Sequence, residues 1–137
     1  MPGSVAVCRA KPKGKRRVQD EWICYPCGND DPTADLLNFN KIIGGTTKVG
    51  SYPNGASLTG ALDMVGNVSE WTADWHAVRY YDVSPIDNPM GPDSASFESC
   101  AGAWCYRDTY ARSIHRNRGV PTKSHNFIGF RWACSQE

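Results

Sequence analysis

Hydrophobic positions along this chain fall in short runs that are separated by Pro, Gly and other turn-forming residues. The apolar residues 5–8 predict a short strand, and the apolar residues 22–27 give way to turn formers at 28–32. Residues 46–55 predict an extended segment with Pro and Asn-Gly turns, whereas residues 82–96 are typical of an ordered surface loop. The pattern therefore predicts short strands, long loops and little helix.

Composition supports a single small domain that is rich in loops. The chain has 137 residues, enough for one modest core, so we expect one domain over residues 1–137. It contains 13 Gly, 9 Pro and five Trp, which favours loops held by large aromatic side chains. The side chains that we expect in the core are Trp71, Trp75, Trp104, Phe130 and Trp132.

Charge and hydropathy exclude several classes of partner. The formal net charge is +1, which provides no global field for nucleic acid or an anionic membrane. The basic residues between Arg9 and Arg17 lack interleaved aromatics, so they predict a solvated arm and no nucleic-acid partner. No run reaches transmembrane length and no signal peptide is visible. We therefore expect a soluble chain without membrane insertion, and its location in the cell is left open.

Several spaced motifs carry a family resemblance. They are Tyr25-Pro26-Cys27-Gly28-Asn29, Asn38-Phe39-Asn40, the block from Asp63 to Trp75, Gly102-Ala103-Trp104, Ala111-Arg112-Ser113 and Ile128-Gly129-Phe130-Arg131. Taken in this order, they resemble the formylglycine-generating enzyme (sulfatase-modifying factor) branch of the C-type lectin fold. The resemblance is best over residues 25–134, and Cys27 stands where the family usually has Trp. It implies an α+β fold with a small antiparallel sheet, sparse helix and long ordered loops.

The same resemblance implies a calcium site in the central block. Carried over by position, its ligands are the side chains of Asp63 and Glu70 and the carbonyls of Gly66 and Val68. Oxygen ligands converging on a tight turn are what calcium prefers. The alternative, in which both carboxylates satisfy backbone groups without an ion, stays open.

The cysteines decide between an enzyme and a binding domain. Catalytic members of the family use two active-site cysteines, which bind copper as thiolates. The corresponding residues 101–113 contain one cysteine, Cys105, so we expect no catalysis and no required cofactor. The alternative is a shortened formylglycine-generating oxidoreductase that uses Cys105.

The other cysteines allow further pairings. Cys100 and Cys134 flank the two C-terminal strands, where they form either a disulfide or free core thiols. Cys24 and Cys27 have the spacing of half a zinc site, but no second pair of ligands follows.

A second resemblance concerns residues 101–131. Variable proteins of diversity-generating retroelements share this fold branch, and their framework is reproduced here by Trp104, Ala111-Arg112-Ser113, Arg116, Pro121 and residues 128–131. In such systems adenine-directed mutagenesis never yields Lys, Glu, Gln, Met or Trp at variable positions. None of these five types occurs between the fixed points at residues 105–110, 114–115, 117–120 and 125–127.

The resemblance therefore implies a variable domain that binds a protein or other macromolecule through residues 105–127. Mixed aromatic, Arg, Asp and Asn side chains are typical of adaptable recognition surfaces. The alternative for this segment is an ordinary C-terminal hairpin of a degenerate family member. The candidate ligand-binding residues are Cys105, Tyr106, Arg107, Asp108, Tyr110, Ile114, His115, Asn117, Arg118, Gly119, Val120, His125, Asn126 and Phe127.

Overall fold

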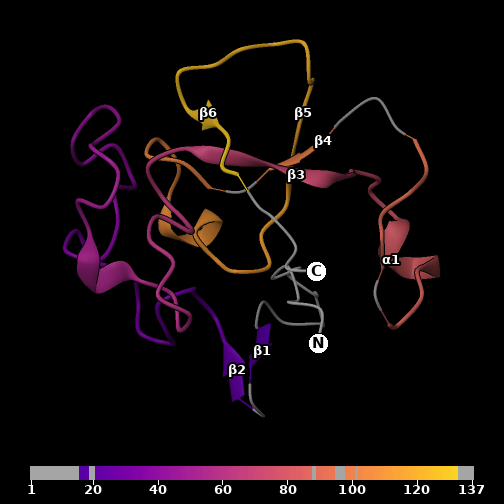
Figure 1. Ribbon diagram of the computed structural model, residues 1–137, viewed down its shortest axis with the longest axis horizontal. Helices are drawn as coiled ribbons and strands as arrows, with labels where there is room; N and C mark the ends of the chain where they lie inside the picture. Colours follow the sequence, from indigo (N-terminus) through magenta and orange to yellow (C-terminus); the bar gives the residue numbers. More distant parts are fainter. Residues whose placement is uncertain (1–15, 19–20, 88, 95–97, 101, 133–137) are drawn as a thin grey trace.

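Short strands and long loops make up the computed structural model, which describes residues 16–18, 21–87, 89–94, 98–100 and 102–132 (Figure 1). In chain order the elements are β1 (Arg16–Val18), β2 (Glu21–Ile23), η1 (Pro53–Gly55), β3 (Ser69–Trp75), α1 (Tyr80–Val83), β4 (Glu98–Cys100), η2 (Asp108–Tyr110), β5 (Asn117–Gly119) and β6 (Ile128–Gly129). Sparse helix and a small sheet are confirmed. No helix in these ranges is long and apolar enough to cross a membrane.

The main sheet has four strands in the order β5-β4-β3-β6. Its β3–β4 and β4–β5 pairs are antiparallel, with Trp71 opposite Cys100 and Cys100 opposite Asn117. The β3–β6 pair is parallel, so the sheet is mixed and the predicted small antiparallel sheet is confirmed only in part. The reason is the connection from β5 to β6, which carries the chain from one edge of the sheet to the other at the top of Figure 1. A crossover of this kind joins strands that run in the same direction.

Two N-terminal predictions meet the structure differently. The predicted strand at residues 5–8 lies outside the described residues. Residues 46–55, predicted as extended with turns, run as coil and end in the 3₁₀ turn η1. An Asn-Gly pair after Pro53 favours this tight turn over a strand.

The buried core is formed by residues outside the named strands and does not contain the tryptophans that we expected there. Its cluster of buried residues consists of Tyr25, Leu37, Phe39, Val65 and Ala111. Trp71, Trp75 and Trp104 are half-buried, which agrees in part with the expectation.

Phe130 and Trp132 are 73% and 93% exposed, so the prediction that they are core residues is wrong. The strand that precedes them, β6, lies at the edge of the sheet and ends at Gly129, so Phe130 and Trp132 lie outside the sheet. Their rings meet edge to face at 6.4 Å.

Two buried asparagines connect the loops to the sheet. Asn67 is only 6% exposed, and its backbone N–H donates to the carbonyl of Asn38, itself 2% exposed, at 2.9 Å. The Asn67 side chain accepts from the Thr47 N–H at 2.9 Å and donates to the Thr47 carbonyl at 3.1 Å. The Asn67 carbonyl accepts from the Trp104 N–H at 3.0 Å. Three segments that are distant in the chain therefore meet at Asn67. We call Asn38 and Asn67 together the asparagine hub.

Backbone conformation at the hub explains two residues of the central block. Gly66 has φ +80°, and a Cβ there would lie 2.7 Å from the Asn38 carbonyl oxygen, so only glycine fits. Asn67 has φ 55°, and asparagine tolerates this left-handed conformation better than most residues. The sequence Gly66-Asn67 is thus selected by the close approach of residue 38.

Replacing Asn67 by Ala is expected to lower the free energy of unfolding by about 2–4 kcal/mol, because the backbone N–H and carbonyl of half-buried Thr47 both lose their hydrogen bonds. Urea unfolding measures the change. Asn40→Ala is the matched control, since Asn40 is exposed and has a similar φ of 51°. It is expected to cost about 1 kcal/mol. Equal losses in the two variants would contradict a structural role for the Asn67 amide.

Candidate recognition surface

Five aromatic side chains from the predicted ligand-binding set meet in one continuous array. Tyr106 and Tyr110 stack at 5.2 Å between ring centroids, and Tyr110 meets His115 edge to face at 4.6 Å. On the other side Tyr106 meets Phe127 edge to face at 5.7 Å, and Phe127 stacks on His125 at 4.9 Å. We call these residues the aromatic ladder. It joins η2, below β3 in Figure 1, to the loop that precedes β6.

Every predicted ligand-binding residue is at least partly exposed. The exposed ones are Arg107, Asp108, Tyr110, Arg118, His125 and Asn126. The half-buried ones are Cys105, Tyr106, Ile114, His115, Asn117, Gly119, Val120 and Phe127. Residues 105–127, which we call the recognition segment, therefore present these side chains without contributing any of them fully to the core.

Main-chain hydrogen bonds hold the recognition segment. The N–H groups of Asn40 and Lys41 donate to the carbonyls of Tyr106 and Trp104 at 2.7 and 2.8 Å. At the other end of the ladder, the Ser69 N–H donates to the Phe127 carbonyl at 2.7 Å. These bonds use only backbone atoms of Tyr106 and Phe127, so a different side chain at either position leaves the bonds intact.

Two of the fixed positions in the middle of the segment also act as anchors. Ala111 is buried in the core cluster, and the Ser113 N–H donates to the Cys24 carbonyl at 2.8 Å. Arg112, between them, is exposed and its positive charge acts on His115. The sequence motifs placed Arg112 in the fixed framework, but its side chain is exposed. Its position between the anchored residues Ala111 and Ser113 could have indicated this exposure.

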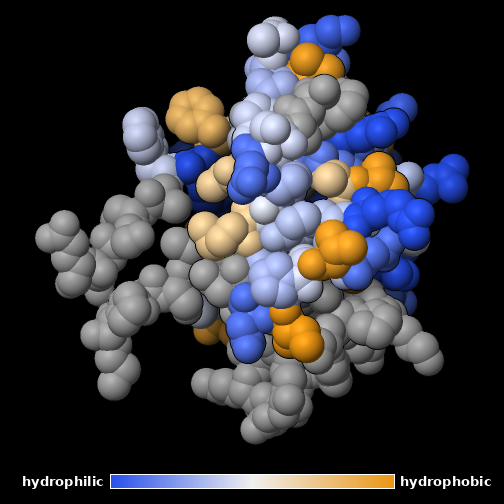
Figure 2. Space-filling model, turned by 90° about the vertical axis from the view of Figure 1, so that its right-hand side faces the viewer, coloured by the Kyte–Doolittle hydropathy of each residue, from blue (hydrophilic) through white to orange (hydrophobic). Residues whose placement is uncertain are grey.

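The face that carries α1 looks different from the recognition segment. Its exposed hydrophobic residues include Val78, Val83 and Ile86. Figure 2 shows hydrophobic side chains on this side as separate spots among hydrophilic ones. Scattered apolar residues of this kind are normal on protein surfaces and do not indicate a binding site.

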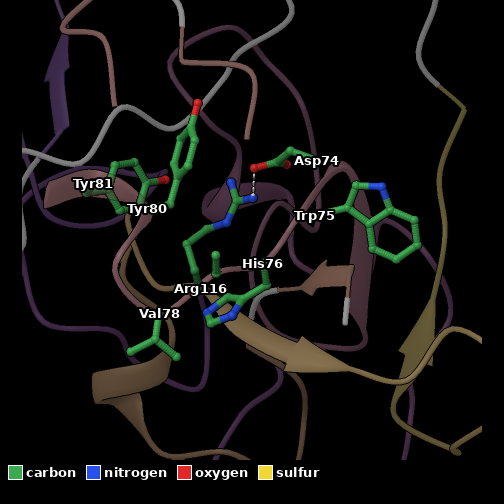
Figure 3. Close-up of a pocket in the computed structure, with 8 residues that line it drawn as sticks. Asp74, Trp75, His76, Val78, Tyr80, Tyr81 and Arg116 are labelled. Atoms are coloured by element: carbon green, nitrogen blue, oxygen red, sulfur yellow. Dashed lines mark hydrogen bonds and ion pairs between the residues drawn. The ribbon is translucent and has the colours of Figure 1, made fainter. Parts of the chain in front are cut away.

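A pocket of about 120 Å³ beside α1 contains the charged pair that fixes the start of β5. Figure 3 shows the Arg116 guanidinium reaching toward the Asp74 carboxylate, with which it forms an ion pair. Arg116 also donates to the Thr72 hydroxyl at 3.1 Å. Burial raises the pKa of Asp74, but the hydrogen bond and charge of Arg116, together with hydrogen bonds from Thr72 and the backbone, lower it below its usual value, so the carboxylate stays ionised. The pair ties the recognition segment to β3.

A second, larger hollow lies against the β5–β6 loop. Its volume is about 270 Å³, and it is lined by Trp71, Pro121, Thr122, Lys123, Ser124, His125, Ile128, Gly129 and Phe130. His125 belongs to the aromatic ladder, so the hollow and the ladder form adjoining parts of one surface.

Two residues of the predicted calcium site, Asp63 and Glu70, contact Arg131. The Glu70 carboxylate accepts from Arg131 Nε at 2.5 Å and Nη2 at 2.8 Å, while the Asp63 carbonyl accepts from Nη2 at 2.9 Å. The Asp63 carboxylate accepts from the Gly50 N–H at 2.7 Å. The hydrogen bond to Glu70 raises the pKa of Arg131 despite partial burial. The Asp63 carboxylate thus bonds to a backbone group, as in the ion-free alternative, whereas the Glu70 carboxylate bonds to an arginine side chain. Calcium at Asp63, Gly66, Val68 and Glu70 stays a prediction.

No group of three His, Cys, Asp or Glu residues capable of holding a metal occurs in the described part of the chain. Cys24, Cys27 and Cys105 are free thiols, and burial raises the pKa of Cys27. The predicted Cys100–Cys134 disulfide involves Cys134, which lies outside the described residues. A copper site needs two thiolates, and the residues around Cys105 do not fit it, because no second cysteine lies between Gly102 and Ser113.

Comparison with known proteins decides the family. The sulfatase-modifying factor enzyme 1-like domain matches residues 24–136, most of the chain. The chain belongs to this family. The formylglycine-generating enzyme of Mus musculus is 36% identical over 66% of the chain, and the hercynine oxygenase of Mycolicibacterium thermoresistibile is 32% identical over 80%. The chain spans 24% and 26% of these two relatives.

A solved structure resembles this sulfatase-modifying factor-like domain in fold. Treponema denticola variable protein 1 superposes with a TM-score of 0.60 and 28% identity, covering 70% of this chain and 34% of that one. PvdO from Pseudomonas aeruginosa gives a TM-score of 0.59 and 25% identity, covering 74% and 40%. The expected fold branch is therefore confirmed by sequence and structure together.

Gly119 differs from the other predicted variable positions because it lies against the framework. A Cβ at this residue would lie 2.5 Å from Trp71 Cη2. Gly119→Ala is therefore expected to cost about 1–3 kcal/mol of unfolding free energy through overpacking. Thermal or urea unfolding measures this. Gly45→Ala, where nothing lies within 4 Å of the added Cβ, is the control and stays within about 0.5 kcal/mol. An unchanged stability for Gly119→Ala would contradict the close contact.

His115 gives the ladder a pH dependence. Burial, followed by the charge of Arg112, lowers the pKa of His115, and its Nε2 is buried without a hydrogen-bond partner in the structure. The unfolded chain therefore binds a proton first, and stability is lost as pH falls below about 6.5. His115→Phe is expected to keep stability at pH 7 and to flatten this loss. Urea unfolding at several pH values measures it, and an unchanged slope would contradict the assignment.

Proposed function

We propose that this domain is a ligand-binding variable protein of a diversity-generating retroelement, built on a C-type lectin scaffold. It binds a protein or other macromolecular target through the recognition segment and performs no catalysis. The observation that carries the proposal is that this segment is held by its backbone while its side chains are displayed. Its backbone is held at Tyr106, Ser113 and Phe127, and just before it at Trp104, while the predicted ligand-binding side chains between these anchors are exposed or half-buried.

The composition of the surface supports binding. Large aromatic side chains and arginines contribute most of the affinity at protein interfaces, and Tyr110 and Arg107 are exposed here. The ladder contacts hold the aromatic side chains close to one geometry before a partner arrives, which reduces the entropy lost on binding. The fold similarity to Treponema denticola variable protein 1 adds to this support.

Sequencing the 3′ end of this gene and its flanking DNA across the source population tests the proposal. We expect substitutions at exposed positions such as Arg107, Tyr110 and Asn126, beside a near-identical template repeat. The codons of Gly66 and Asn67 are expected to stay constant, because the close approach of Asn38 requires glycine at 66 and the Asn67 side chain bonds to Thr47. A uniform gene without a repeat would contradict the proposal.

A formylglycine-generating oxidoreductase is the second candidate, and the identity to the Mus musculus enzyme favours it. In that case Cys105 is the surviving thiolate, and the domain oxidises a cysteine within a peptide. An assay of peptide-cysteine oxidation with added copper tests this, with Cys105→Ala as the variant and Cys27→Ala as its control. Activity that only Cys105→Ala abolishes would establish the enzyme and overturn the binding proposal.

A further inference from the structure

Positive charge is concentrated in the recognition segment. Residues 105–127 contain five of the chain's 15 Lys and Arg residues but only one of its 14 Asp and Glu residues. Arg107, Arg112, Arg118 and Lys123 are exposed. Because the whole chain has a net charge of only +1, this surface differs in charge from most of the molecule.

Two described acidic groups, Asp108 within the segment and Asp74 beside it, have polar partners in the structure. Asp108 accepts a hydrogen bond from the Thr109 N–H at 2.8 Å, at the start of η2. Asp74, on β3, forms an ion pair with Arg116. Among the exposed side chains of the segment, Arg107, Arg112, Arg118 and Lys123 therefore outnumber the single carboxylate of Asp108.

Basic and apolar groups also share the larger hollow. Trp71, Ile128 and Phe130 provide its apolar lining, Lys123 provides a positive charge, and no Asp or Glu lines it. The exposed side of Phe130 extends this apolar surface. A partner that fits here has apolar side chains for the hollow and negative charge beside them.

We propose that the recognition segment binds an acidic segment of a partner protein, with apolar side chains in the hollow and carboxylates facing Arg107 and Lys123. The proposal rests on the binding function proposed above. Complementary charge of this kind increases the association rate and excludes cationic partners. Single-stranded nucleic acid is less suited, because bases stack on free ring faces, and one face of each of Tyr106, Tyr110, His125 and Phe127 is already covered by its stacking partner.

Selection of a random displayed peptide library against the full chain at low salt tests the partner class. We expect enriched peptides to carry more Asp and Glu than Lys and Arg, together with apolar residues. Raising the salt from about 50 to about 300 mM is expected to weaken their binding by about tenfold. Arg107→Glu with Lys123→Glu is expected to weaken binding at least as much. Lys48→Glu with Arg79→Glu, an equal charge change at exposed residues elsewhere, is the control and retains binding.

The outcomes separate this inference from the proposed function. Peptides without acidic excess that lose binding in Tyr110→Ala would overturn the acidic partner and retain the binding function. Failure to enrich any peptide, or binding that neither Tyr110→Ala nor the double variant changes, would overturn both. Tighter binding of a 12-nucleotide oligo(dT) probe than of the peptides, lost in the double variant, would overturn the protein partner.

Discussion

The buried hydrogen bonds of Asn67 determine where the recognition segment lies. One residue bonds to Asn38, Thr47 and Trp104, which are far apart in the chain, and it does so from a left-handed backbone conformation. A buried amide left without partners costs free energy comparable to that of several apolar contacts. Separating any one of the three segments from Asn67 is therefore unfavourable. The part of the chain that the structure describes has one four-residue α-helix and a small core, so these hydrogen bonds hold together segments that packed helices would hold in other folds.

The atoms that fix the backbone of the recognition segment are therefore separate from the side chains that it displays. The anchors at Tyr106 and Phe127 are carbonyl groups, so the chain holds these residues without reference to their side chains. The side-chain anchors, Arg116 and Arg131, reach back to Asp74 and Glu70 on β3. A surface built in this way tolerates changes in recognition chemistry without loss of its backbone geometry.

The sequence predicted the fold branch because this branch is marked by motifs in a fixed order. Prediction from the sequence failed where burial and strand pairing depend on where a strand ends and which strand lies next to it. Phe130 and Trp132 follow a predicted strand, but their exposure results from its edge position and early end, which hydropathy does not encode. The parallel pairing of β6 depends on a crossover that local patterns do not specify. The aromatic ladder could be predicted as a set of residues, whereas its contacts required the structure.

The most direct test of this separation is amide hydrogen exchange in the wild-type chain and in a variant with Arg107, Tyr110, His125 and Asn126 all replaced by Ser. If the backbone is fixed independently of the displayed side chains, the amides of Asn67, Ser69 and Trp104 exchange slowly and at unchanged rates in both proteins, because their acceptors are retained. Faster exchange of these three amides in the variant would show that the displayed side chains themselves hold the fold, and would contradict the separation.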